Sequence, residues 1–208
     1  MKNNLSLAHL LFPHLKGRWG AVDLNKEAAK LNTFGPNPLL DAKVCEQWVS
    51  KLHSDRRLDF SYGGFLEDRS VLWRDHYMTK GHTIHLGIDY NVPVNTFVAL
   101  PCAAELLYAR EDKDQGGGWG GQLFFGVKHG PRFILGHLHQ LVSGIGKVYE
   151  KGAIVGAIAP SSINGGWYPH LHLQCTKIFM PGIDGYGNET VAKRCLDPVC
   201  LLETHSHK

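Results

Sequence analysis

Three short segments carry the residues most able to do chemistry: 85–89 (HLGID), 136–139 (GHLH) and 170–172 (HLH). Each segment alternates polar with apolar residues, and successive side chains of a β-strand point to opposite faces. In an extended chain the first segment therefore presents His85 and Asp89 on one face, and the third presents His170 and His172. We expect one face of a sheet to gather imidazoles and a carboxylate, while the other face packs into a core.

Two histidines and one carboxylate, with a fourth position left open, are typical of a catalytic zinc site, whereas a structural site is usually closed by four protein ligands. Gly87 lies between His85 and Asp89 and has no side chain to fill the space where a metal would sit. The alternative is that these histidines are solvated or buried in a core, since the chain has 13 of them. Three segments with matching alternation favour the metal site.

The sequence contains no HExxH motif, which excludes the helical arrangement of many zinc proteases. The general base must then be a residue other than the glutamate of that motif. Histidines beyond the ligand set are the candidates, because imidazole titrates near neutral pH.

The order of the three motifs resembles the lysostaphin/LytM-type zinc endopeptidases, whose motifs are HxxxD, a middle His usually followed by Leu or a small polar residue, and HxH. The resemblance runs from about residue 81 to 174, roughly half of the chain, and includes residues 89–96 and 152–156. It implies a mostly antiparallel β structure with a groove across the sheet. Carried over by position, it implies that His85, Asp89 and His172 bind Zn²⁺.

The same resemblance implies that His137 and His170 are the catalytic pair of a zinc metallopeptidase. Zinc lowers the pKa of a bound water towards ~7 and polarises the scissile carbonyl. One of the two histidines takes the water's proton, and the other stabilises the oxyanion or protonates the leaving nitrogen. Which residue does which stays open. His139, offset by ~7 Å along the strand from His137, either supports the site from outside the ligand set or is exposed.

A narrower resemblance concerns residues 164–174 (NGGWYPHLHLQ), which are similar to a cytoplasmic branch of this family. In that branch, similar domains occur beside kinase-like and aminotransferase domains. Residues 62–64, Glu67 and Arg69 upstream, and residues 197–198 downstream, are also similar to it. A chain of 208 residues leaves no room for such fusion partners.

Composition is that of one soluble globule, with 43% hydrophobic and 20% charged residues, and the length allows a sizeable core without disulfides. A formal net charge of +3 is too small to favour nucleic acid as a partner. The apolar run at residues 5–12 is interrupted by His9, ends at Pro13 and is too short to span a membrane. It is also a poor secretory signal.

The five cysteines are odd in number and lack a paired spacing, which favours free thiols in a reducing compartment. Cys175 is expected on the core face, opposite His172. We therefore expect a cytoplasmic protein, with the periplasm as the alternative location. The family resemblance favours a peptide or peptidoglycan-fragment substrate. Two alternatives are a cytoplasmic hydrolase of a small-molecule amide or ester, and a non-catalytic binding module of the same fold.

The expected fold is mainly β, an antiparallel, split-barrel-like metallopeptidase core with a helical N-terminal extension. The predicted division is an extension at 1–75, a zinc-peptidase-like domain at 76–180 and a loop-rich tail at 181–208. A helix is predicted over 41–54, capped by Asp41, with an apolar stripe at Val44, Trp48, Val49 and Leu52. Strands are predicted over residues 97–109, 122–128, 132–139, 147–149, 154–158 and 171–177. The glycine-rich loop at 116–121 is predicted to be a plain connection, or else a groove wall with Trp119 touching substrate.

Overall fold

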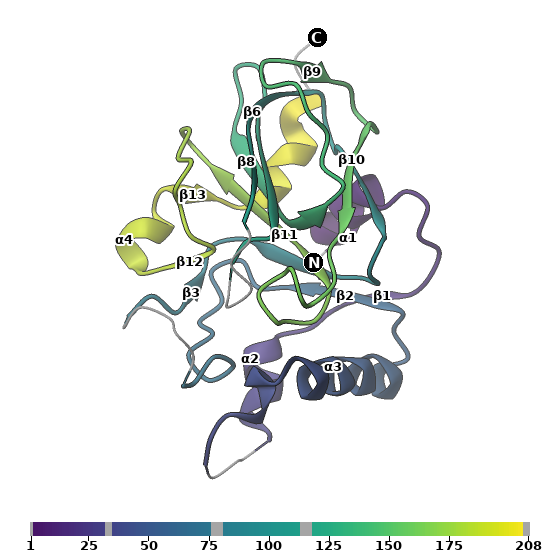
Figure 1. The fold of residues 1–208 in the computed structure, drawn as a ribbon, viewed down its shortest axis with the longest axis vertical. Coiled ribbons are helices and arrows are strands. Elements are labelled where there is room, and N and C mark those ends of the chain that lie inside the picture. Colours follow the sequence, from purple (N-terminus) through teal and green to yellow (C-terminus); the bar gives the residue numbers. More distant parts are fainter. Residues whose placement is uncertain (1, 32–34, 76–80, 113–117, 206–208) are drawn as a thin grey trace.

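A computed structural model describes residues 2–31, 35–75, 81–112 and 118–205. An eleven-stranded sheet dominates it, with a path β1-β2-β4-β11-β8-β7-β6-β9 from which β5, β10 and β13 branch (Figure 1). β3 and β12 form a separate two-stranded sheet. The strands are β1 (Trp19–Ala21), β2 (Phe60–Gly63), β3 (Ile84–His85), β4 (Ile88–Asn91), β5 (Phe97–Ala99), β6 (Ala104–Glu111), β7 (Gly121–Gly126), β8 (Arg132–His139), β9 (Val148–Tyr149), β10 (Ile154–Ile158), β11 (His170–Thr176), β12 (Tyr186–Gly187) and β13 (Cys195–Leu196).

The central strand β11 brings the three motifs together, because it lies between β4 and β8. Its His172 is paired with Asp89 on one side and with Gly136 on the other. All strand pairs are antiparallel except β1 with β2. The expected mainly β, antiparallel core with a helical extension is confirmed, and the predicted strands over 132–139 and 154–158 match β8 and β10.

The single strand predicted over 97–109 is wrong: the chain forms β5 and β6 with an irregular stretch between them. Pro101 lies in that stretch, and proline can donate no hydrogen bond to a neighbouring strand. The two strands then join different neighbours, β5 pairing with β10 and β6 with β7 and β9.

The predicted helix over 41–54 is α3 (Ala42–Arg56), and Asp41 caps it as expected. The Asp41 carboxylate accepts hydrogen bonds from the backbone N–H groups of Lys43 and Val44, at 2.9 and 3.0 Å. The predicted stripe is only partly right, because Val44 is 40% exposed whereas Val49 is fully buried. The buried face is rotated to include Cys45 and His53.

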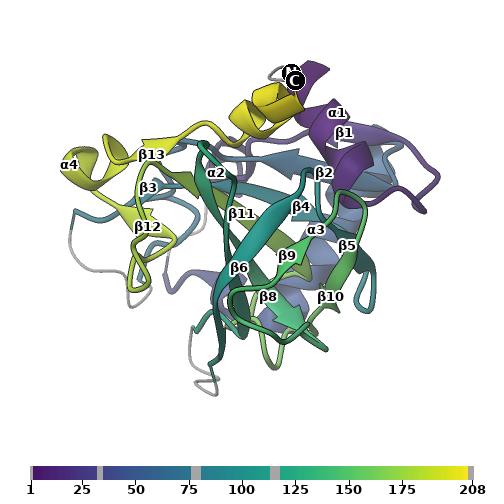
Figure 2. The ribbon, with the colours of Figure 1, turned by 90° about the horizontal axis from the view of Figure 1, so that it is seen from above.

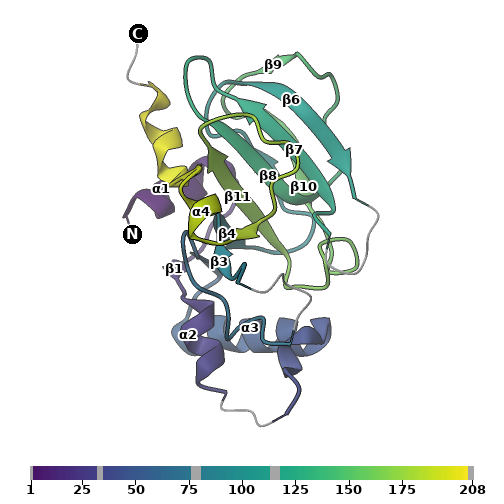
Figure 3. The ribbon, with the colours of Figure 1, turned by 90° about the vertical axis from the view of Figure 1, so that its left-hand side faces the viewer.

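Two further helical elements complete the extension below the sheet, α2 (Leu24–Ala29) and the 3₁₀-helix η1 (Pro38–Leu40), with α2 beside α3 (Figure 3). They share a second apolar cluster with α3, and this cluster also buries Trp167. Trp167 precedes the HxH motif by three residues, so the extension packs beneath the segment that leads into β11.

The first and last helical elements of the described chain lie side by side (Figure 2). Helix α1 (Lys2–Leu11) packs against the 3₁₀-helix η2 (Pro198–His205), and Leu7, Leu11 and Leu201 are fully buried in the main core. The segment predicted to be a loop-rich tail therefore carries β12, β13, η2 and a short helix α4 (Glu189–Ala192). The predicted boundaries near residues 75 and 180 stay predictions.

All five cysteines are free thiols, and Cys175 packs in the main core as expected. Within the described ranges, none of the helices is both long and apolar enough to cross a bilayer.

Candidate metal centre and active site

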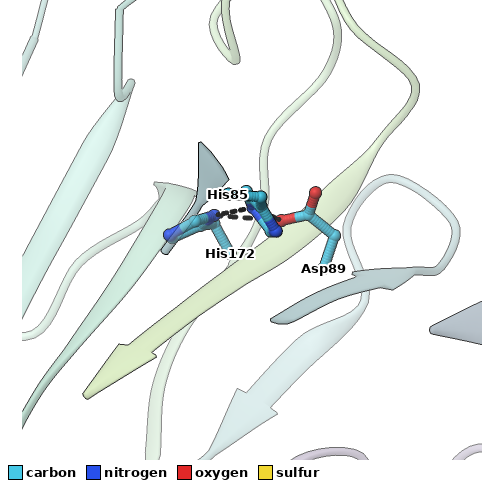
Figure 4. A group of neighbouring side chains, drawn as sticks. All are labelled: His85, Asp89 and His172. Atoms are coloured by element: carbon cyan, nitrogen blue, oxygen red, sulfur yellow. Dashed lines mark hydrogen bonds and ion pairs between the residues drawn. The ribbon is translucent and has the colours of Figure 1, made fainter. Parts of the chain in front are cut away.

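Three side chains from three strands point toward one another at the middle of the sheet (Figure 4). His172 Nδ1 lies 3.0 Å from both His85 Nε2 and Asp89 Oδ1, and His85 Nε2 lies 3.3 Å from the same carboxylate oxygen. All three residues are buried, with exposed fractions of 0–3%. The structure thus brings together the three predicted ligands.

The hydrogen bonds on the far side of each ring fix which nitrogen carries the proton. His85 Nδ1 lies 2.9 Å from the Gly64 carbonyl oxygen, which can only accept, so Nδ1 is protonated and Nε2 keeps its lone pair. His172 Nε2 lies 3.0 Å from Gln174 Oε1. The Gln174 amide nitrogen donates to the Asp184 carbonyl, which leaves Oε1 to accept from His172 and leaves His172 Nδ1 unprotonated.

Three electron-pair donors therefore face one another with no proton between them. This arrangement is repulsive in the absence of a cation and suits a metal. Tetrahedral ligands at the usual zinc distance are about 3.3 Å apart, close to the separations found among His85, Asp89 and His172. Outer partners that fix the tautomer of a ligating histidine are also a regular feature of metal sites. The donor set fits zinc.

Asp89 is held from behind by a fully buried arginine. Arg69 Nη1 donates to Asp89 Oδ2 at 2.5 Å, which leaves Oδ1 to face the two histidines. Burial opposes ionisation of Asp89, but the positive charge of the hydrogen-bonded Arg69 guanidinium helps to hold the pKa of that carboxyl well below its usual range. The third ligand is therefore an anion at neutral pH.

The two predicted catalytic histidines line the same pocket as Asp89 and His172. The rings of His137 and His170 have centroids 4.3 Å apart. His170 Nδ1 donates to the Tyr168 carbonyl oxygen at 2.7 Å, so Nε2 carries the lone pair, 3.8 Å from Asp89 Oδ1. Burial lowers the pKa of His170 and lowers that of His137 well below the usual value, so both rings are neutral.

His137 breaks the alternation of its strand. Its backbone is left-handed, with φ of 62°, which is uncommon for a residue other than glycine. The segment is also held by a hydrogen bond from His137 N–H to the Trp119 carbonyl at 2.8 Å. Within the described part of the chain, its buried Nδ1 has no hydrogen-bond partner. Local strain at such a residue is common at functional sites.

The remaining pocket walls come from two segments: one that the sequence offered only as the less favoured alternative, and one that it placed in a loop-rich tail. Trp119 stacks on His137 with centroids 5.8 Å apart and meets His172 edge-on at 5.1 Å. The favoured interpretation of its loop as a plain connection is therefore wrong at Trp119, although residues 116 and 117 lie outside the described residues. Asp184, Gly185 and Tyr186, from the predicted tail, also line the pocket.

The HxxxD segment differs from the extended strand that was predicted, because the chain bends at residues 86–87 between β3 and β4. Leu86 and Ile88 consequently enter two different apolar clusters instead of sharing one face. Gly87 does not leave room for the metal itself. A Cβ there would lie 2.5 Å from the Leu173 carbonyl oxygen and 2.7 Å from His172 Nε2, so glycine allows the ligand ring to approach.

The alternation of the HxH motif is confirmed, since His170 and His172 line the pocket while Leu171 and Leu173 are buried in the main core. His139 does not line the pocket. Gln174 was detectable in principle, because it lies two residues after His172 on the same face. Arg69 was noted only as part of the narrower family resemblance, without a role, and Tyr186 gave no local signal. Both reach the site through the tertiary fold.

The buried histidines predict how the stability of the metal-free protein depends on pH. Burial lowers the pKa of His85 to about 3, and an unfolded histidine titrates near 6.5. Between these values the unfolded chain binds more protons, so stability rises with pH and is lost on acidification below ~6.5, by up to ~1.4 kcal/mol per pH unit for each such histidine.

Denaturant unfolding of chelator-treated protein should therefore give a lower free energy of unfolding at pH 5 than at pH 7.5. His170→Gln removes one histidine whose pKa is lowered in the folded protein. The free energy of unfolding of this variant should therefore depend less steeply on pH. A free energy of unfolding that is constant over this range would contradict neutral, buried imidazoles.

No protein-family model and no curated protein matches the chain. Among solved structures, it is similar to the catalytic domain of the antimicrobial peptidase lysostaphin from Staphylococcus simulans. That match has 20% identity and a TM-score of 0.49, and it covers 76% of this chain and 97% of that one.

Two further solved structures are similar. One is a variant catalytic domain of the prophage-encoded M23 protein EnpA from Enterococcus faecalis, with 21% identity, a TM-score of 0.43, and coverage of 60% of this chain and 85% of that one. The other is a zinc-containing peptidase from Vibrio cholerae, with 16% identity and a TM-score of 0.44; the match covers 61% of this chain and 33% of that one. These solved structures support the lysostaphin/LytM-type fold that the sequence motifs imply.

Proposed function

We propose that this protein is a zinc-dependent hydrolase of peptide (amide) bonds, a metalloendopeptidase that acts on peptidoglycan-type peptides. One observation carries the proposal. Three unprotonated donor atoms, on His85, Asp89 and His172, converge beside a pocket that is also lined by the neutral histidines His137 and His170. Such a site combines a place for a metal with groups that can move protons.

Zinc held by His85, Asp89 and His172 would supply a water of lowered pKa and would polarise the scissile carbonyl. His170 is placed to accept a proton, because its Nδ1–H is committed to the Tyr168 carbonyl and its Nε2 is free. His137 lies beside it and would donate a hydrogen bond to the carbonyl oxygen or a proton to the leaving nitrogen. Among the described residues His137 Nδ1 has no hydrogen-bond partner, which leaves the tautomer of this ring able to change during the reaction.

The shape of the pocket supports a substrate with small side chains. Its volume is about 50 Å³, and Trp119 forms one wall. A bulky side chain beside His137 would meet the Trp119 ring, which supports a peptide of small residues over a bulky amide.

Two alternatives from the sequence remain outcomes of the test. A small-molecule amide or ester in the cytoplasm would use the same metal and histidines, and the cytoplasmic location itself stays a prediction. A non-catalytic binding module of the same fold is disfavoured, because the proposed ligands and both catalytic histidines are present and in contact around one site.

Mass spectrometry of reaction products tests the proposal most broadly. The protein is incubated with a panel of muropeptides, cytosolic peptides and small amides, with and without a zinc chelator. We expect cleavage of an internal amide bond in muropeptides that stops with chelator and returns with added zinc. Cleavage confined to small amides or esters would support the first alternative. No cleavage of any panel member by zinc-loaded protein would support a binding module.

A further inference from the structure

The buried arginine behind the metal site makes contacts that connect three separate segments. Arg69 is 1% exposed, and its guanidinium donates to Asp89 Oδ2 at 2.5 Å, to Glu67 Oε2 at 3.2 Å and to the Tyr186 hydroxyl at 3.2 Å. Its own backbone is fixed by a bond from Arg69 N–H to the Thr83 carbonyl. A charge so deeply buried is costly unless every such contact is in place.

The two carboxylate oxygens of Asp89 have different partners. Oδ2 is bound by Arg69, and Oδ1 faces His85 Nε2 and His172 Nδ1. Rotation of the carboxylate would break the shortest of these contacts. The arginine therefore selects which oxygen is offered to the metal and from which direction.

The site is shaped for a guanidinium and not merely for a positive charge. Arginine presents its N–H donors in a fixed plane, whereas the lysine ammonium is a point charge on a flexible stem. Gly64 also leaves room for it, since a Cβ there would lie 2.3 Å from Arg69 Nη2 and 2.6 Å from His85 Nδ1. The turn that accepts the His85 hydrogen bond thus packs against the arginine as well.

We propose that Arg69 is a positioning residue of the metal centre, which fixes Asp89 as a ligand through one oxygen. The segment before the HxxxD motif then completes the site, because both Arg69 and Trp73, which donates to the Tyr186 hydroxyl at 2.7 Å, come from it. This inference rests on the proposed zinc site. The competing role for Arg69 is only to neutralise buried charge.

The substitution R69K separates the two roles, because it keeps the charge and removes the fixed fork. The zinc dissociation constant is measured by competition with a chromophoric chelator at pH 7.5, where Glu67, whose pKa burial raises to about 6, is ionised. We expect R69K to weaken zinc binding by about ten- to a hundredfold, as other outer partners of metal ligands do. R56K is the matched control, since Arg56 pairs with Glu27 far from the site. It should stay within about twofold of the wild type.

Absorption spectra of the cobalt-substituted proteins give a second readout, because a ligand that turns changes the ligand field. We expect an altered spectrum for R69K and an unaltered one for R56K. If R69K does not fold, the double variant E67Q/R69M replaces the ion pair with neutral groups and leaves the net charge of the cluster unchanged; it should also bind zinc at least tenfold more weakly.

The inference would be overturned if R69K bound zinc as tightly as the wild type and kept an unchanged cobalt spectrum, or if the double variant kept wild-type affinity. Arg69 would then only neutralise buried charge, and the zinc site itself would stand. Failure of the wild-type protein to bind zinc would overturn both the inference and the proposed function.

Discussion

Substituting alanine for His172 is expected to reduce the bound zinc from about one ion per chain to a small fraction of that. His172 Nδ1 lies 3.0 Å from both other ligand atoms, so it forms the centre of the donor set. Its removal leaves one imidazole and one carboxylate, too few to hold the ion against buffer. Elemental analysis of desalted protein measures the loss.

The matched control is His139→Ala, because His139 lies on β8 near the site but does not line the pocket. That variant should keep its full zinc content. If His172→Ala also keeps a full complement, His172 is not a ligand and the proposed donor set is wrong.

The second large effect concerns turnover. His137→Ala and His170→Ala are each expected to keep zinc and to lose turnover by roughly a hundredfold or more, the usual contribution of a general acid or base. The reason is their position, since both rings line the pocket and neither belongs to the converging donor set. Zinc content and steady-state rates are measured on the same preparations.

The two variants also separate the roles of the histidines. His170 is held with Nε2 unprotonated, so its loss should remove the acid limb of the pH–rate profile that a base requires. Loss of metal in either variant would instead make that residue a ligand. Wild-type turnover in both would exclude the proposed acid–base pair.

The sequence allowed the HxH end of the site to be predicted because β11 obeys simple alternation. His170 and His172 face the pocket, and Leu171 and Leu173 face the core, as a period of two requires. The strand is central and fully paired, so nothing disturbs that period.

The same logic failed in the other two segments, where the backbone is irregular. The bend at Gly87 separates Leu86 from Ile88, and left-handed geometry turns His137. Both departures are imposed by tertiary contacts. Gly87 is packed against the His172 ring, and His137 is held by the Trp119 carbonyl. The alternation of polar and apolar residues in the local sequence does not predict such contacts.

The outer parts of the site lay beyond sequence reasoning for a related reason. Arg69 precedes the first ligand by 16 residues, and Tyr186 follows the last by 14. Tyr186 reaches the pocket because β12 pairs with β3, and Arg69 reaches Asp89 because the segment before β3 folds back on β4. The long strand predicted over 97–109 failed differently, because Pro101 lies where β5 has ended and β6 has not begun.

The position of the metal ion tests the account most directly. Crystals of zinc-loaded protein, measured on both sides of the zinc absorption edge, locate the ion by its anomalous scattering. We expect one strong peak at about 2.0–2.2 Å from each of His85 Nε2, Asp89 Oδ1 and His172 Nδ1, with the fourth coordination position facing His137 and His170. A peak elsewhere, or one bonded to either of those two histidines, would contradict the proposed donor set.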